Sequence, residues 1–184
     1  MSKKEYIHYG SKEFDPKLVD KSLEVMRNFE PYDGVGKFNM IKNYGFKPKG
    51  LWASPVNAAY GWKEWCESEE FHTERLNSSF RFTLSNKAKI LKIRTEKDIM
   101  DYLILSDYTK DRIKNDKCLK ITKNIKIYTS TSDRFNLSKL AEDYDGIELF
   151  LSDNYNSLRY SVFYSWDCDS ICIWNKDIIN IIEE

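Results

Sequence analysis

Residues 47–66 read Lys-Pro-Lys-Gly-Leu-Trp-Ala-Ser-Pro-Val-Asn-Ala-Ala-Tyr-Gly-Trp-Lys-Glu-Trp-Cys, and they hold three of the five tryptophans of the chain. Gly50 to Ala53 has the character of a short apolar strand, and Ser54-Pro55 then predicts the start of a helix that runs to about Cys66. An aromatic residue before such a turn, followed by others ten positions later, can form a two-sided slot for a flat ring. Nicotinamide is a ring of this kind.

Periodicity outside this stretch predicts several short strands and further helices. The expected strands are residues 6–9, 79–84, 87–94, 118–129, 147–151, 158–164 and 170–174. The expected helices follow capping residues at Asp15, at Thr95 and at Asn136 or Ser138, and they run over residues 16–28, to about 105 and through 144. Residues 31–45 are expected to form a loop, and Ser85-Asn86 to join two strands. The pattern predicts an α+β fold with its helices near the N-terminal half, in a single domain over residues 1–184.

Composition excludes several classes of protein. Lys+Arg and Asp+Glu are balanced at 29 each, so no bulk field draws the chain to nucleic acid or to an anionic membrane. No segment approaches the roughly 20 apolar residues of a membrane span. The four cysteines are too few and too irregular for a disulfide framework, and with only two histidines they do not suit a zinc site. A reduced, soluble, cytoplasmic protein without a metal is expected.

Two other places could carry chemistry. His8 ends the first predicted strand, where its imidazole could donate a hydrogen bond to a ribose hydroxyl beside the permissive Gly10. Asp167 and Asp169 lead into an apolar strand, where partly desolvated carboxylates could stabilise a developing positive charge. The two acids are two positions apart, so in an extended chain both side chains could point to the same face. Without a functional role, His8 would be a histidine at the edge of the sheet, and Asp167 and Asp169 would be solvated acids in a turn.

Taken in order, these motifs resemble the diphtheria-toxin-like and poly(ADP-ribose) polymerase-like ADP-ribosyltransferases. His8 matches the histidine that ends the first strand in that family, and Trp52 in Gly50-Leu51-Trp52-Ala53-Ser54 matches the first aromatic. Asn57-Ala58-Ala59-Tyr60-Gly61-Trp62 matches the helix with a small residue and a second aromatic, and Asp169 matches the late acid that opens a strand. The resemblance spans essentially the whole chain.

The resemblance implies a split, mostly antiparallel sheet that binds NAD as a co-substrate without a metal. His8 would fix the nicotinamide ribose, and the backbone at Tyr9 or Gly10 would pair with the carboxamide. Trp52 and either Tyr60 or Trp62 would enclose the ring. The residues expected to bind NAD are therefore His8, Tyr9, Gly10, Trp52, Ser54, Tyr60 and Trp62.

The activity implied is mono-ADP-ribosyl transfer to a macromolecular acceptor, either protein or nucleic acid, with His8, Trp52 and Asp169 as catalytic residues. Asp169 would support the positive charge that develops as nicotinamide leaves. The run from Lys110 to Lys126, with seven bases against two acids, could guide a nucleic acid acceptor. Whether the protein has an inhibitory partner is left open.

The chain departs from the family in three places: it has tryptophan rather than tyrosine at Trp52, aspartate rather than glutamate at Asp169, and Tyr9 between His8 and Gly10. These departures leave open a relative that binds NAD without reacting, or another non-catalytic module that holds a nucleotide or base on its aromatics. An RNA 2′-phosphotransferase on a similar fold would need clustered arginines, and Arg75, Arg81 and Arg94 form no readable cluster.

Overall fold

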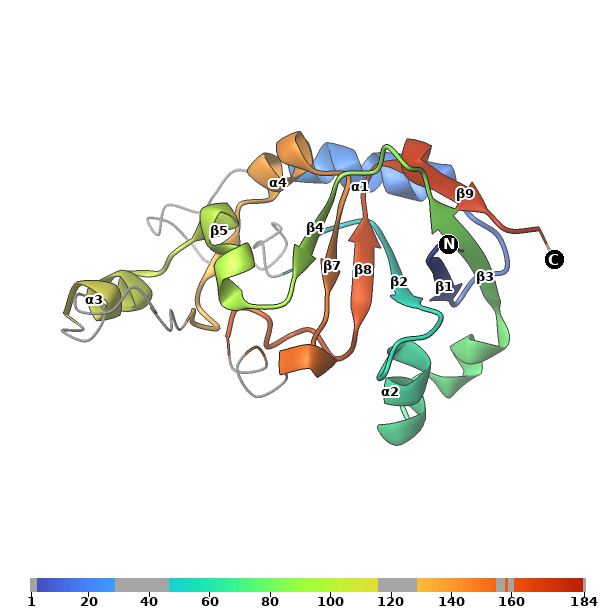
Figure 1. Ribbon diagram of the computed structural model, residues 1–184, viewed down its shortest axis with the longest axis horizontal. Coiled ribbons are helices and arrows are strands. Elements are labelled where there is room, and N and C mark those ends of the chain that lie inside the picture. Colours follow the sequence, from blue (N-terminus) through green and yellow to red (C-terminus); the bar gives the residue numbers. More distant parts are fainter. Residues whose placement is uncertain (1–2, 29–46, 116–128, 155–157, 159–160, 184) are drawn as a thin grey trace.

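The computed structural model describes residues 3–28, 47–115, 129–154, 158 and 161–183, which form an α+β fold (Figure 1). Its strands are β1 (Glu5–Tyr9), β2 (Leu51–Pro55), β3 (Ser79–Leu84), β4 (Ile90–Ile93), β5 (Leu103–Ile104), β6 (Arg134–Phe135), β7 (Gly146–Leu149), β8 (Ser170–Ile173) and β9 (Ile179–Ile181). Its α-helices are α1 (Pro16–Arg27), α2 (Trp62–Ser68), α3 (Asp107–Asn115) and α4 (Leu137–Asp143). The predicted loop at 31–45 and, apart from Thr129, the predicted strand at 118–129 lie outside the described residues.

Seven strands form one sheet in the order β4-β7-β8-β2-β1-β3-β9, and β5 pairs separately with β6. Neighbouring strands are antiparallel except β4 and β7, which run parallel, so the predicted mostly antiparallel sheet is confirmed. β3 and β4 follow each other along the chain but lie near opposite edges of the sheet. The turn at Ser85-Asn86 therefore leads from one side of the sheet to the other.

The pairing between β1 and β2 is short. β1 pairs with β3 along its whole length, from Glu5 to Tyr9. It pairs with β2 only through Tyr6 opposite Pro55 and Ile7 opposite Ser54. The ladder between the two central strands thus ends before His8, which leaves backbone groups beyond it for other partners.

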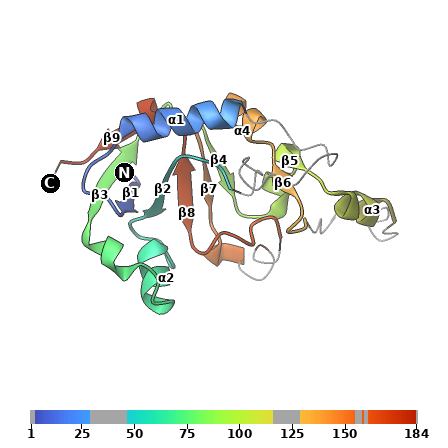
Figure 2. The ribbon, with the colours of Figure 1, turned by 180° about the vertical axis from the view of Figure 1, so that it is seen from behind.

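Strand alternation divides the core between the two faces of the sheet. Cys172 and Trp174 pack in a cluster with residues of α1, α4 and the turn that ends at Trp166. Ile171 and Ile173 face the other way, into a cluster with Tyr6 of β1 and aromatic residues of β3. Figure 2 shows α1 and α4 side by side along one end of the strands, whereas α2 lies at the opposite end. β8 is therefore buried on both faces, whereas β2 is buried from Ala53 to Pro55 and half-buried at Leu51 and Trp52.

Two helix starts were predicted correctly from their caps. Asp15 accepts a hydrogen bond from the amide of Lys17 at the start of α1, and Pro16 occupies the first turn, where no amide is needed. Asn136 likewise accepts from the amide of Lys139 at the start of α4.

The helix predicted from Ser54 is wrong at its beginning. Ser54 and Pro55 remain in β2, because both are paired with β1. The helix begins instead at Trp62, after Gly61. Ser54 still caps it, since its Oγ accepts from the amide of Trp62 at 2.9 Å across eight residues of chain. Ser54 therefore does contact the start of the helix, but from eight residues away rather than from the position next to it.

Three other expectations are corrected. The helix predicted after Thr95 is two 3₁₀ turns, η2 (Glu96–Asp98) and η3 (Met100–Tyr102), because Leu103 and Ile104 pair with β6 as β5. The strand predicted at 158–164 is wrong over residues 161–164, which form successive turns. These turns bury the consecutive residues Val162 and Phe163 together, which a strand would place on opposite faces. The helices are not confined to the N-terminal half, because α3 and α4 lie in the second half.

Within the described ranges, no helix combines the length and the apolar character needed to cross a membrane. Nor do three or more His, Cys, Asp or Glu side chains gather there as ligands for a metal ion.

Candidate functional site between β1, β2 and β8

His8 is half-buried beside the end of the β1–β2 ladder, and its ring packs against Phe80 with centroids 5.1 Å apart. Its Nδ1 lies 2.7 Å from the carbonyl oxygen of Trp52. Because a carbonyl only accepts, Nδ1 carries the proton and donates it. Burial lowers the pKa of His8 from its ordinary value of 6.5, and the bond to Trp52 opposes this only in part. The ring is therefore neutral at pH 7, with Nε2 as a hydrogen-bond acceptor rather than the donor expected from the sequence.

The backbone groups of Tyr9 and Gly10, which follow His8, point to different neighbours. The amide of Gly10 donates to the carbonyl of Ser78 at 2.8 Å, so it is already used. Backbone groups alternate in direction along a strand, and those of Tyr9 turn toward β2, where the ladder has ended. Of the two predicted carboxamide partners, the geometry favours Tyr9. Gly10 has a φ of +103°, which favours glycine at this position.

Ser54 joins three of the predicted segments. Its side chain is buried, and its Oγ donates to the carbonyl of Asp169 at 3.0 Å while accepting from the amide of Trp62 at 2.9 Å. The amide of Asp169 in turn donates to the carbonyl of Tyr60 at 2.9 Å. Together with the bond from His8 to Trp52, these contacts bring all four sequence motifs to strand β2.

The carboxylate of Asp169 is occupied by the protein. It is 5% exposed, and it accepts from the amide of Ser152 at 2.8 Å and from the Oγ of Ser152 at 2.5 Å. Each oxygen takes one of these bonds, so the acid caps the turn η5 (Ser152–Asn154). Any role of Asp169 toward a ligand must share its carboxylate with Ser152.

The aromatic residues of the predicted slot fall into two groups. Trp52 is half-buried and meets Trp166 edge-on with centroids 4.7 Å apart. Trp62 stacks on Trp65 with centroids 4.9 Å apart. Tyr60 shares a hydrogen bond of 2.6 Å with Ser68 instead.

Among the described residues, Trp52 makes no ring contact with Tyr60 or Trp62. Enclosure of a ligand ring between these residues therefore stays a prediction.

A cavity of about 730 Å³ adjoins Asp169, at the end of β8 where α2 also lies. Phe150 lies in its wall near two cations, with Lys4 Nζ at 4.8 Å and Arg94 Cζ at 4.1 Å from the ring centroid. Arg94 also pairs with Asp153. Sequence analysis missed this cavity, because Lys4 and Arg94 are 90 residues apart in the chain, just before β1 and just after β4. The other residues that line it are Lys3, Glu5, Pro55, Val56, Asn57, Ala58, Ala59 and Ser152.

Glu148 is a buried acid that sequence analysis also missed. It is fully buried in β7, where Oε1 accepts from Lys4 Nζ at 2.6 Å and from the Tyr6 hydroxyl at 3.1 Å. Its Oε2 has no partner among the described residues. Burial, and then the Glu148 carboxylate, raise the pKa of Tyr6. An acid inside the apolar run 147–151 was the available signal, since buried carboxylates need partners.

The thiols close to this site are protonated. Burial raises the pKa of Cys168 to about 12, and it also raises the pKa of Cys172. Because only a thiolate is a strong nucleophile, neither cysteine is suited to covalent catalysis at neutral pH.

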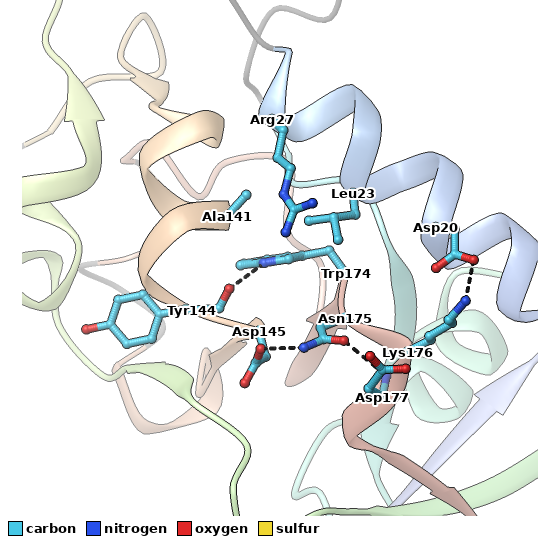
Figure 3. A pocket seen from close by; sticks show the side chains of 10 residues that line it. All are labelled: Asp20, Leu23, Arg27, Ala141, Tyr144, Asp145, Trp174, Asn175, Lys176 and Asp177. Atoms are coloured by element: carbon cyan, nitrogen blue, oxygen red, sulfur yellow. Dashed lines mark hydrogen bonds and ion pairs between the residues drawn. The ribbon is translucent and has the colours of Figure 1, made fainter.

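A second cavity, of about 380 Å³, lies at the other end of β8 between α1 and α4 (Figure 3). There Trp174 donates from Nε1 to the carbonyl of Tyr144 at 2.7 Å, and Lys176 pairs with Asp20 at 2.6 Å. Asn175 donates to the Asp145 carboxylate at 2.7 Å. Most polar side chains drawn there thus bond to one another, away from the convergence at β2.

The basic run from Lys110 to Lys126 is described only to residue 115. Lys110, Arg112 and Lys114 lie on α3, which projects at the end of the molecule opposite to α2 (Figure 1). This part of the run is remote from the candidate site.

Comparisons of the chain with protein-family models, with curated proteins and with solved structures found no match.

Proposed function

We propose that the chain is an NAD-dependent mono-ADP-ribosyltransferase that modifies a macromolecular acceptor, protein or nucleic acid. The observation that supports this most is the convergence at β2. One side of the strand meets His8 through the carbonyl of Trp52, and Ser54 meets both Asp169 and Trp62. Four motifs that are distant in sequence are thus joined to one strand by hydrogen bonds, which supports the proposal.

The groups at this place fit NAD in kind. A neutral imidazole, strand backbone beyond the β1–β2 ladder, aromatic faces and a carboxylate are the groups that a ribose, a carboxamide and a cationic ring bind. NAD supplies an ADP-ribosyl group on a cationic leaving group: the glycosidic C–N bond breaks, its electron pair stays on nicotinamide, and the acceptor nucleophile takes the sugar carbon and loses a proton. The protein therefore needs mainly to position groups and to stabilise charge.

Each residue then has a defined task. His8 accepts a hydrogen bond from a ribose hydroxyl at Nε2, because its Nδ1 is held by Trp52. The backbone of Tyr9 bonds the carboxamide at the opening of the ladder. Asp169 stabilises positive charge on the sugar. The acceptor approaches through the cavity of about 730 Å³, which has Asp169 in its wall.

The test is release of nicotinamide from NAD, together with mass spectrometry of protein and nucleic acid for added ADP-ribose. His8→Gln and Asp169→Asn should each lower nicotinamide release by about a hundredfold or more, which is the usual scale for removing one preorganised group. His72→Gln is the matched control, because His72 is exposed. Equal activity of the His8 and His72 variants would overturn the assignment.

A second function, a non-catalytic nucleotide-binding module, is favoured by one observation. Both carboxylate oxygens of Asp169 already accept bonds from Ser152, which is the arrangement of a structural cap. In that case NAD binds, as calorimetry would show, but no nicotinamide is released at any enzyme concentration. Nicotinamide release by the wild-type chain excludes this alternative.

A further inference from the structure

Lys47 places a cation over the indole of Trp52. Its Nζ lies 5.3 Å from the ring centroid, within the range of a cation–π contact. The same Nζ lies 3.9 Å from Oδ2 of Asp167. The side chains of Lys47 and Asp167 are 35% and 28% exposed, so both remain accessible from solvent.

An aromatic face with a carboxylate beside it is a receptor for an organic cation. The ring supplies its negative face, and the acid supplies the opposite charge at short range. Burial lowers the pKa of Lys47, against the opposing effect of Asp167, so the ammonium is held in a partly desolvated place. The ammonium of Lys47 thus occupies the place that a bound cation would take.

We propose that Trp52 and Asp167 form a binding site for a planar organic cation of the pyridinium class, which enters by displacing the ammonium of Lys47. The inference deepens the proposed function and rests on it for the identity of the cation, the nicotinamide ring of NAD. It assigns the charge-balancing acid beside the ring to Asp167, while Asp169 caps η5 and faces the cavity.

A flat ring suits this site better than a compact ammonium does. Trp166 packs edge-on against Trp52 and forms a wall beside it. A planar pyridinium could stack on the face of Trp52 that the ammonium of Lys47 now covers, and it would bury more ring surface there than an ammonium does.

Displacement of Lys47 needs no change in the fold. A lysine that is about one third exposed can move its ammonium into water while its methylene stem stays packed. An ion pair with this exposure contributes little to stability, so its loss is tolerated. The apparent affinity for the ligand falls by the fraction of molecules in which Lys47 occupies the site.

The probe is 1-methylnicotinamide, a pyridinium cation, with neutral nicotinamide as its uncharged counterpart, both titrated by calorimetry. Lys47→Met should bind 1-methylnicotinamide about tenfold more tightly than the wild type, because the competing cation is gone. Lys49→Met is the matched control, since Lys49 is exposed and lies two residues away. Adding Asp167→Asn to Lys47→Met should remove the gain. If Lys47→Met does not fold, Lys47→Gln takes its place.

Equal affinities of the Lys47 and Lys49 variants would overturn the proposal. So would an equal gain for nicotinamide, which would indicate only a vacated apolar space. Nicotinamide release from NAD is measured on the same proteins. Nicotinamide release without selective pyridinium binding would refute this site and leave the proposed function standing. Selective pyridinium binding without nicotinamide release would support this site and refute the proposed transferase activity.

Discussion

Nδ1 of His8 lies 2.7 Å from the carbonyl oxygen of Trp52, just where β1 and β2 stop pairing through their backbones. A side chain thus takes over the bond that a backbone amide would otherwise make. The two central strands are held together there while the backbone of Tyr9 stays outside the ladder. The same contact fixes the tautomer of the ring and leaves Nε2 as its acceptor.

The contribution of His8 to stability should depend on pH. Its pKa is lowered in the folded state, so below about pH 6.5 the unfolded chain binds more protons than the folded one. The stability that neutral His8 provides is therefore complete above pH 6.5 and is lost as the pH falls through the folded pKa. His8→Asn keeps an amide donor that does not titrate. Urea unfolding of both proteins between about pH 5 and 8 should show the wild-type advantage shrinking toward acid; a constant difference would contradict the tautomer argument.

Ser54→Ala should destabilise the fold, because it removes the acceptor for the amide of Trp62 and the donor to Asp169. We expect a loss of about 1–3 kcal/mol in the free energy of unfolding, since the buried backbone groups lose a partner. Ser79→Ala is the control, because Ser79 is exposed in β3. Its effect should stay within about 0.5 kcal/mol. Similar losses for both variants would show that the bridge at Ser54 matters little.

Ser152→Ala distinguishes the two tasks of Asp169. The change removes the 2.5 Å bond from Oγ to the carboxylate but keeps the bond from the backbone amide. If Asp169 acts on the sugar of NAD, the freed oxygen should sustain or increase nicotinamide release relative to the wild type. A fall as deep as that of Asp169→Asn would instead assign Asp169 a structural role. Thermal unfolding of both variants separates activity from loss of fold.

Lys4→Met should destabilise the protein more than an exposed lysine would suggest. Its side chain is 45% exposed, but its ammonium is the cation that lies against the buried Glu148. Removing it leaves that carboxylate with Tyr6 as its one remaining partner among the described residues, at a cost of about 1–3 kcal/mol. The double variant Lys4→Met/Glu148→Gln should recover part of this loss in a double-mutant cycle. Strictly additive losses would show that the pair is not coupled.

Gly50→Ala should prevent β2 from pairing closely with β8. A Cβ at this position would lie 2.2 Å from the carbonyl oxygen of Ile173, which is backbone and cannot move aside cheaply. We expect a loss of at least about 2 kcal/mol, as for overpacking in a core. Gly10→Ala meets open space, with Arg75 Cδ at 3.9 Å, so it should cost only the strain of its positive φ. Equal melting temperatures for the two variants would refute the role of close approach.

Local signals in the sequence predicted the elements whose causes are local. Asp15 and Asn136 mark helix starts because a cap acts within three residues. The strand at 79–84 alternates because it buries one face. By contrast, the start of α2 combines a local contact, from the amide of Gly61 to Glu64, with the bond from Trp62 to Ser54 eight residues upstream, and no local rule places that hydroxyl against Trp62.

For the candidate site, that His8, Ser54 and Asp169 bind a ligand stays a prediction. The structure shows how they are linked to β2: His8 bonds to the carbonyl of Trp52, and Ser54 bonds to the carbonyl of Asp169. That Asp169 caps η5, and that Asp167 pairs with Lys47, depends on how the chain turns between β7 and β8. Alternation alone would place both acids on one face, but neither residue lies in a strand.

The order of the strands has a consequence for synthesis on the ribosome. β8 fills the centre of the sheet between β7 and β2, although its residues emerge after all strands of the sheet except β9. Until Ser170–Ile173 leave the exit tunnel, β2 and β7 lack their common neighbour, and nascent chains expose two unpaired edges. Such late, long-range closure makes for slow folding and gives chaperones a window in which to act.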